Sequence, residues 1–295
     1  MGGMPKPSPL PAELLGRAFR VAEARDRGVG GSRMRRADLV RPVHGVRVPA
    51  GTDVDRVRAL ALVLGPRRRF SHTTAAALWG APLPSAASTD AGIHVASLDG
   101  AALVRRPGVV AHRTTDPKVS RVDGLPTSTP ARTWAECATV LGHRELVVLG
   151  DHLVGRSGLA SPEDLGRAIR PRGHGAVAAR AALELVRVGS ESRMETLLRL
   201  GVVDAGFPEP ELNMDVYDER GAFLGRVDMC WPALRIALEY DGDHHRERDV
   251  FRYDQRRANG FTVNGWIVIH ATASDAAQPA VLYERLRQAF AARMR

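Results

Sequence analysis

The chain has 295 residues and a mass of 31.9 kDa, a length that allows two or three domains, each with its own core. Its composition, 44% hydrophobic and 25% charged, excludes a coiled coil and a disordered acidic tail. Cys137 and Cys230 have no Cys or His at metal-ligand spacing, so we expect reduced thiols. Without a signal-peptide pattern or an apolar run long enough to span a membrane, we expect a cytoplasmic protein with no membrane partner.

The net charge of +9 is distributed unevenly along the chain. Residues 1–189 carry 28 basic and 16 acidic side chains, a net +12, whereas residues 190–295 carry 14 basic and 17 acidic ones, a net −3. Because a positive field attracts nucleic-acid phosphates, we expect DNA to bind first to the N-terminal two thirds. Since 40 of the 42 basic residues are arginine, GC-rich coding is an alternative origin of this bias.

Residues 1–55 have the element order of a winged helix-turn-helix. Helical spacing of apolar residues predicts one amphipathic helix over 12–29, followed by a short basic helix that begins after Ser32 and by an extended hairpin that turns at Gly45. In that fold the second helix faces the major groove and the wing contacts phosphate. The predicted DNA-binding residues are Arg33, Arg35 and Arg36 on the helix and Arg47 on the wing. The alternative is a solvated basic helix face.

Residues 56–188 predict an α/β middle region that is mainly helical after residue 131. Helices are expected within 56–80, strands at 92–97 and 108–113, and further helices beginning at Pro130 and after Ser161. His72, His94 and His112 are separated in sequence and lack ligand spacing. We therefore expect them to be surface or packing residues and not a metal site.

Residues 189–295 predict a small mixed sheet flanked by helices. The pattern is a helix over 191–205, strands within 211–218, 222–231 and 234–242, a long helix, and a strand within 265–271. A hairpin turn at Ala233 and Leu234 sets the register between the two middle strands. The facing pairs are then Trp231–Ile236, Cys230–Ala237, Met229–Leu238, Asp228–Glu239, Val227–Tyr240 and Arg226–Asp241.

Alternation along these strands separates an apolar face from a charged one. Trp231, Met229, Val227, Ile236, Leu238 and Tyr240 form the predicted core face, and Arg226, Asp228, Glu239 and Asp241 form the opposite face. Directly facing carboxylates have Cβ atoms about 4.5–5.5 Å apart and repel unless a cation lies between them. Mg²⁺ (or Mn²⁺) on Asp228, Glu239 and Asp241 would polarise a phosphodiester.

The alternative is a structural one. Arg226 then neutralises Asp241 across the strands, while Asp228 and Glu239 are exposed on a solvated face. A register slip of one residue would exchange the two faces.

The order of Glu195 in SRMETLLRL, Asp228 in GRVDMCWP and Glu239 in ALEYDGDHH resembles the PD-(D/E)XK restriction-endonuclease-like superfamily. More closely, it is similar to the branch related to the very-short-patch-repair (Vsr) endonuclease, over residues 189–295. The resemblance implies a Mg²⁺-dependent DNA endonuclease in which Asp228 and Glu239 bind the metal and Glu195 completes the acidic cluster. His245 would contact the phosphate or transfer a proton.

The sequence departs from the superfamily at position 241, where the usual lysine is replaced by Asp241. Phosphate stabilisation then comes from the metal, His245, Arg248 or Arg257, or is missing. The Vsr-like branch does not depend on that lysine. For Glu195, an alternative is an i, i+4 ion pair with Arg199 on a helix surface.

The N-terminal part resembles the antitoxin component of AbiEi-type abortive-infection systems. The resemblance rests on the predicted winged helix followed by FSHTTAAALWG and GLPTSTPART. It implies a winged helix that binds promoter DNA. The whole chain is similar to an architecture in which an AbiEi-like part precedes a Vsr-like nuclease domain.

These observations predict a DNA-binding protein with a Mg²⁺-dependent, endonuclease-like domain that hydrolyses DNA phosphodiesters. A second hypothesis is a non-catalytic transcriptional regulator or antitoxin that uses the C-terminal fold for dimerisation or partner binding. DNA is the expected partner; a homodimer and a toxin encoded by a neighbouring gene stay open. An RNA-directed nuclease ranks lower because only 5% of the residues are aromatic.

Overall fold

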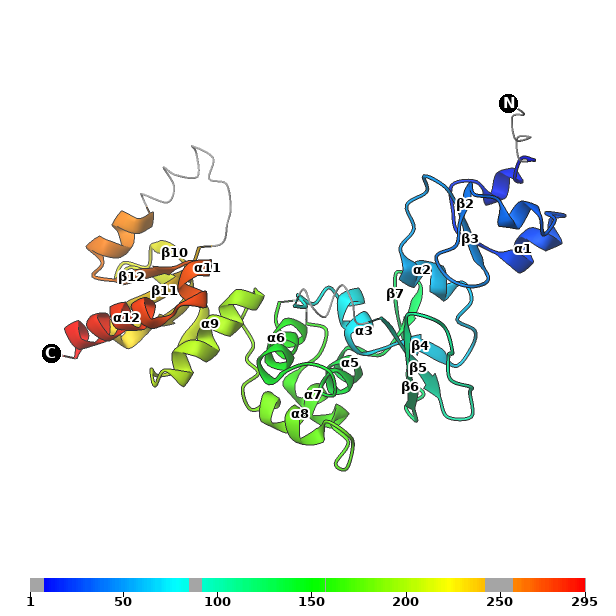
Figure 1. Cartoon of the computed structure of the whole chain (residues 1–295). Helices are drawn as coiled ribbons and strands as arrows, with labels where there is room; N and C mark the ends of the chain where they lie inside the picture. The colour runs from blue at the N-terminus through cyan, green and yellow to red at the C-terminus, as the bar shows by residue number, and fades with distance from the viewer. Residues whose placement is uncertain (1–7, 85–91, 157, 242–256, 295) are drawn as a thin grey trace. The chain divides into compact units, whose positions relative to one another are not determined.

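The computed structural model describes residues 8–84, 92–156, 158–241 and 257–294, and this part of the chain is a mixed α/β structure with three sheets (Figure 1). The chain divides into two compact units, residues 1–129 and 130–295. Residues 56–129 therefore group with the N-terminal segment, and residues 130–188 group with the C-terminal sheet. Across the described ranges, none of the helices combines the length and apolar character that a membrane span needs.

The first 50 residues form short elements around a three-stranded sheet of order β1-β3-β2. The elements are η1(Ala12–Leu14), β1(Phe19–Arg20), α1(Val21–Asp26), η2(Arg33–Arg35), β2(Leu39–Val40) and β3(Val46–Pro49). The prediction of one helix over 12–29 is wrong, because Gly16 has φ +69° and Phe19 continues as a strand paired with Arg47. The predicted basic helix is a single 3-10 turn.

A five-stranded sheet of order β6-β5-β4-β8-β7 completes the first unit. Its elements are α2(Arg56–Ala61), β4(Arg68–Phe70), α3(His72–Leu78), β5(Ile93–Leu98), β6(Val109–Thr114), β7(Ser120–Val122) and β8(Leu125–Thr127). The two predicted strands are confirmed as β5 and β6, which pair in parallel. Strand β4 lies where only helices were expected; it pairs with β5 and β8, and Phe70 is fully buried.

Four helices open the second unit: α5(Pro130–Cys137), α6(His143–Val154), α7(Pro162–Ala168) and α8(Ala176–Leu183). Two predicted starts are confirmed, since α5 begins at Pro130 and Ser161 caps α7 through a capping box with Asp164.

Cys137 and Cys230 are both buried free thiols, as expected.

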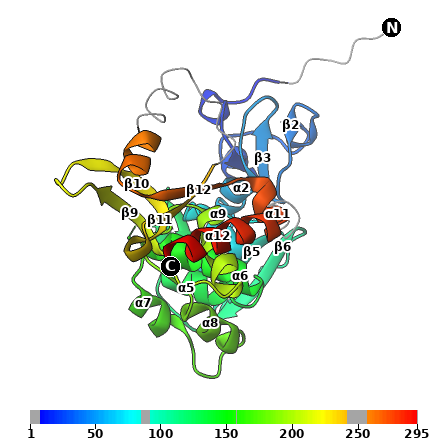
Figure 2. The same ribbon diagram turned by 90° about the vertical axis from the view of Figure 1, so that its left-hand side faces the viewer.

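The remaining residues form a mixed sheet of order β12-β11-β10-β9 with helices on both faces. The elements are α9(Arg193–Asp204), β9(Glu211–Tyr217), β10(Phe223–Trp231), η3(Pro232–Leu234), β11(Ile236–Tyr240), helical residues 257–263, β12(Ile267–Ala271), α11(Ala273–Ala277) and α12(Ala280–Arg293). Strands β11 and β12 are parallel, and the other pairs are antiparallel. Helix α12 lies along one face, and helical residues 257–263 lie on the other (Figures 1 and 2).

The predicted register of the β10–β11 hairpin is confirmed where the strands pair. The observed pairs are Trp231–Ile236, Cys230–Ala237 and Met229–Leu238. The predicted core face packs on α9 and α12 through Met229, Trp231, Ile236 and Leu238. Val227 is the exception: it packs with Cys230, Ala237 and Phe261 on the opposite side. The second face is therefore partly apolar, because helical residues 257–263 cover it.

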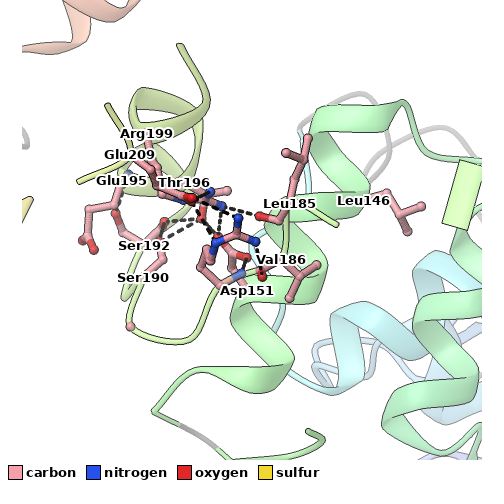
Figure 3. A network of polar contacts seen from close by, with 12 residues as sticks. Leu146, Asp151, Leu185, Val186, Ser190, Ser192, Glu195, Thr196, Arg199 and Glu209 are labelled. Atoms are coloured by element: carbon pink, nitrogen blue, oxygen red, sulfur yellow. Dashed lines mark hydrogen bonds and ion pairs between the residues drawn. The ribbon is translucent and has the colours of Figure 1, made fainter. Parts of the chain in front are cut away.

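Helix α9, which carries Glu195, is fixed to α6 by a buried polar network (Figure 3). Arg199 of α9 donates to the Asp151 carboxylate of α6 at 2.9 Å, and Thr196 donates to the same carboxylate at 2.9 Å. Arg193 forms a second ion pair with Glu145 of α6. These contacts anchor α9 on the side facing α6, while its apolar residues pack on the sheet.

Candidate functional site

Asp228 lies on β10 at the point where the β10–β11 ladder ends. Its carboxylate accepts a hydrogen bond from the Tyr240 backbone N–H at 2.7 Å. The last paired residues before it are Met229 and Leu238, so the carboxylate takes the place of a strand carbonyl for the next amide of β11. This bond holds the half-buried Asp228 side chain beside the residues of β11.

The environment of Asp228 raises its pKa to about 6. Burial is the largest cause, and the nearby Glu195 and Glu239 carboxylates raise the pKa further, whereas the Tyr240 N–H and Arg257 lower it. The two acidic side chains predicted to belong with Asp228 therefore lie close enough to act on its charge. A carboxyl that titrates near neutrality is a common feature of functional sites.

Glu239 of β11 is buried, with 8% of its surface exposed, and forms a bidentate ion pair with Arg257. The Arg257 Nη1 donates to Glu239 Oε2 at 2.9 Å, and Nη2 donates to Oε1. Arg257 also donates to the Arg226 backbone oxygen at 2.5 Å, and its guanidinium lies 5.2 Å from the centre of the Phe261 ring. The alternative in which Glu239 is exposed on a solvated face is wrong, because helical residues 257–263 cover that face.

Glu195 is also buried, and its carboxylate contributes to the local fold. Its Oε2 accepts from the Glu191 backbone N–H at 2.8 Å and from the Asn213 amide at 2.8 Å, while Ser192 caps the helix through the Glu195 N–H. The alternative of a surface ion pair with Arg199 is wrong. Arg199 turns to Asp151 instead, because both residues lie between packed helices.

Asp241 lies just beyond β11. Its backbone N–H donates to the Ala271 oxygen at 2.8 Å, and its carboxylate is 3.3 Å from His270 Nδ1. The expected pairing of Asp241 with Arg226 is not observed, because Arg226 binds Glu191 at 2.8 Å and lies 3.8 Å from Asp215. Asp241 therefore directs its carboxylate toward β12.

Two further predicted residues, His245 and Arg248, lie outside the described residues. Among the described residues, the acidic side chains do not form a group of three whose ligand atoms all lie within 4.8 Å of one another. Glu195 and Glu239 therefore act on Asp228 through their charge, without the close approach of ligand atoms seen in a metal site, and Arg257 binds Glu239.

The four predicted DNA-binding arginines occupy different environments. Arg33 is 8% exposed, and its guanidinium donates to both carboxylate oxygens of Asp38 at 2.8 and 2.7 Å and to the Ser8 backbone oxygen at 2.6 Å. Arg47 donates to the Met34 oxygen at 2.8 Å. These bonds connect the short elements of the N-terminal segment, which contradicts the expectation that Arg33 faces solvent.

Arg35 and Arg36 lie closer to the surface than Arg33 does. Arg35 is exposed on the 3-10 turn, and the neighbouring Arg36 is half-buried. Of the basic residues on the turn, Arg35 is the one whose exposure best fits a contact with a nucleic acid.

The structure brings together three histidines that the sequence pattern did not connect. His72, His94 and His112 come from α3, β5 and β6, and one ring nitrogen from each lies within 4.8 Å of the others. They are separated in sequence but adjacent in space, and the buried His72 and His94 agree with the expectation of packing residues. Residue spacing could not reveal the cluster, because its members come from the start of one helix and from two strands that are far apart in sequence.

The chain is a mixed α/β protein with a group of acidic residues where the pairing of β10 and β11 ends, away from the hairpin turn. Two similar proteins are known from Mycobacterium tuberculosis: uncharacterized protein Rv2248 of strain H37Rv and uncharacterized protein MT2308 of strain CDC 1551. Each is 29% identical to this chain over 241 residues, which cover 80% of the chain and 86% of the relative. No model of a known protein family matches the chain, and no solved structure matches it.

Proposed function

We propose that this chain is a DNA-binding protein whose residues 189–295 form a Vsr-like, Mg²⁺-dependent endonuclease domain. The observation that carries the proposal is the placement of Asp228 and Glu239 on adjacent strands, with a pKa of about 6 for Asp228 that reflects burial and neighbouring negative charge. Carboxylates in such a group gain stability from a cation between them.

The available donors are carboxylate oxygens, the ligand type that a hard divalent ion prefers, and Glu239 would have to exchange Arg257 for the ion. Mg²⁺ or Mn²⁺ would be held by Asp228 and Glu239 and would supply Lewis-acid polarisation of a DNA phosphodiester. Glu195 supports this set indirectly, because it fixes the Glu191 amide and the Asn213 side chain beside the sheet.

Arg257 is the residue that replaces the missing lysine in this proposal. In the structure its guanidinium binds Glu239, and it would leave that carboxylate when the site is loaded. A guanidinium binds two oxygens of a phosphate as readily as two of a carboxylate. Arg257 would then hold the phosphate and offset the charge that develops on it.

The positive charge of residues 1–189 supports the DNA-binding part of the proposal. The net +12 of residues 1–189 and the exposed Arg35 favour contact with a phosphate backbone, and the resemblance to AbiEi-type antitoxins suggests the same target. The net −3 of residues 190–295 favours cations over DNA, so residues 1–189 would supply most of the affinity for DNA.

A second candidate function is a regulator without catalysis, and one observation favours it. Arg257 already neutralises Glu239, and Glu195 already has its hydrogen-bond donors, so two of the three acidic residues have partners without an added ion. In that case the C-terminal sheet would serve dimerisation or binding of a toxin partner.

Incubation with supercoiled plasmid distinguishes the two functions. Cleavage is measured with Mg²⁺, with Mn²⁺ and with a chelator, for the wild type and for Asp228→Asn and Glu239→Gln. Asp215→Asn is the matched control, because it removes an exposed carboxylate from the same sheet. Metal-dependent cleavage that is lost in the first two variants and kept in the control supports the nuclease. DNA binding without cleavage by the wild type supports the regulator.

A further inference from the structure

The three clustered histidines lie on rigid elements of the first unit. His72 is the first residue of α3, His94 is on β5, and His112 is on the parallel neighbour β6. In the β5–β6 register Val110 faces His94 and His112 faces Ala96, so both histidines point to the same face of the sheet. Helix α3 adds the third ring to that face.

The rings are in mutual contact. His72 stacks on His112 with a centroid separation of 3.7 Å, and the other two separations are 5.1 and 5.3 Å. His94 Nδ1 lies 2.9 Å from His112 Nε2. Nitrogens around a tetrahedral Zn²⁺ lie about 3.3 Å apart, as Zn–N bonds of about 2.0–2.1 Å require. The ring planes are within 28° of parallel, so binding a common ion would require the rings to tilt until each plane points at it.

Local contacts fix the positions of the histidines. His72 has φ +49°, an uncommon left-handed conformation for a non-glycine residue, and its Nδ1 lies 3.0 Å from Ser71 Oγ. The Thr74 hydroxyl accepts from the His94 backbone N–H at 2.9 Å and so joins α3 to β5. A polar neighbour on one ring nitrogen is a common way of orienting a metal-binding histidine.

The environment keeps the three imidazoles neutral. Burial lowers the pKa of His72 to about 3 and that of His94 to about 4, and the neighbouring imidazoles lower both further; burial also lowers the pKa of His112. The neutral ring is the form that binds metals.

We propose that His72, His94 and His112 form a binding site for a divalent transition-metal ion, and that Zn²⁺ is the ion that fits this site. Three imidazoles suit Zn²⁺ and not Mg²⁺, which prefers oxygen ligands. Three protein ligands leave a fourth position for water or an exogenous ligand, as in zinc sites that are not purely structural. The site is independent of the acidic cluster on β10 and β11.

The competing explanation is a packing cluster of stacked neutral rings that binds no ion. Titration of the full-length, metal-free protein with Zn²⁺ against a chromophoric chelator tests the proposal, and Co²⁺ substitution reports the ligand geometry through its visible absorption. The probes are the metals alone, in a buffer that contains excess Mg²⁺. We expect one high-affinity Zn²⁺ per chain, a tetrahedral Co²⁺ spectrum and no displacement by Mg²⁺.

The informative variant is His112→Asn, because His112 is the most exposed of the three rings and its replacement perturbs the core least. We expect it to weaken Zn²⁺ binding by more than about 100-fold, and His94→Gln to do the same. His44→Asn, which changes an exposed histidine of the same unit, should leave the affinity unchanged, as should Asp228→Asn.

A thermal-melt measurement keeps the result clear if a variant folds poorly. Zn²⁺ should raise the melting temperature of the wild type and of His44→Asn but not that of His112→Asn. No tight binding by the wild type, or equal binding by the wild type and a folded His112→Asn protein, would overturn the proposal and leave the packing cluster.

Discussion

The Arg199 guanidinium and the Asp151 carboxylate form an ion pair at 2.9 Å in which both side chains are only 1% exposed (Figure 3). Arg199 also donates to the Leu185 backbone oxygen at 2.8 Å, and Asp151 also accepts from the Arg187 N–H at 2.8 Å. The pair joins α9, which packs on the C-terminal sheet, to α6 of the helical segment. Burial raises the pKa of Asp151 even though Arg199 and these donors lower it.

Replacing Arg199 with Met should destabilise the second unit strongly. The change leaves Asp151 buried without its cation, and such a loss costs about 3–5 kcal/mol. Urea denaturation followed by circular dichroism measures the free energy of unfolding. The matched control is Arg144→Met, which breaks the exposed ion pair with Asp204 between the same two helices and should cost less than about 1 kcal/mol. Similar losses in the two variants would show that the buried pair has no special role.

The pKa of about 6 for Asp228 predicts an unusual pH dependence of stability. Between about pH 4 and pH 6 the native state binds more protons than the unfolded state, so this group makes stability fall as pH rises. Asp228→Asn keeps an acceptor for the Tyr240 N–H and removes the charge. In a metal-free buffer the variant should be more stable than the wild type above pH 6 by about 1–3 kcal/mol, with the difference vanishing near pH 4. Denaturation curves across this range measure it; a constant difference contradicts it.

Arg257→Gln should affect ion binding and catalysis in opposite directions. Without the guanidinium, Glu239 is available to a cation, so the affinity for Mn²⁺ should rise several-fold in isothermal titration. Cleavage of plasmid DNA should fall, because the phosphate loses its bidentate donor. Arg235→Gln, an exposed arginine paired with Glu219, is the control. Weaker Mn²⁺ binding in Arg257→Gln would mean that Arg257 orders Glu239 for the ion instead of competing with it.

Arg35 and Arg33 should behave differently when each is replaced with Ala. Arg35→Ala should weaken DNA binding for all sequences and reduce the slope of log affinity against log salt by about 1, as expected for one lost phosphate contact. Arg33→Ala should lower the melting temperature of the protein instead, because the buried guanidinium holds Asp38 and Ser8. Fluorescence anisotropy at several salt concentrations, together with thermal melts, separates the two effects. A stable Arg33→Ala protein with reduced DNA affinity would reverse the assignment.

Much of the C-terminal sheet was predictable from the sequence. The period-2 pattern of Met229, Trp231, Ile236 and Leu238 predicted the core face, and the turn after Trp231 fixed the register of three observed pairs. The prediction failed at Val227, where helical residues 257–263 supply an apolar partner on the other face. An alternating pattern assigns residues to faces but does not say whether a helix covers the second one.

The N-terminal segment was predicted less well. Apolar residues at helical spacing over 12–29 indicated one helix, but Gly16 and the pairing of Phe19 with Arg47 give a turn, a strand and a short helix. Tertiary pairing overrode a local helical pattern, because the fully buried Phe19 gains more from packing in the core than from continuing a helix.

The sequence by itself determined the elements whose signals lie within a few residues: the capped helix starts, the β10–β11 turn and the alternation of Met229, Trp231, Ile236 and Leu238. Only the tertiary structure decided the long-range partners. Arg257 reaches Glu239 across 18 residues, Arg199 reaches Asp151 across 48, and three histidines from different elements meet on one face. Caps and alternation follow from local backbone geometry, whereas the partner of a buried charge or ring depends on which elements pack together.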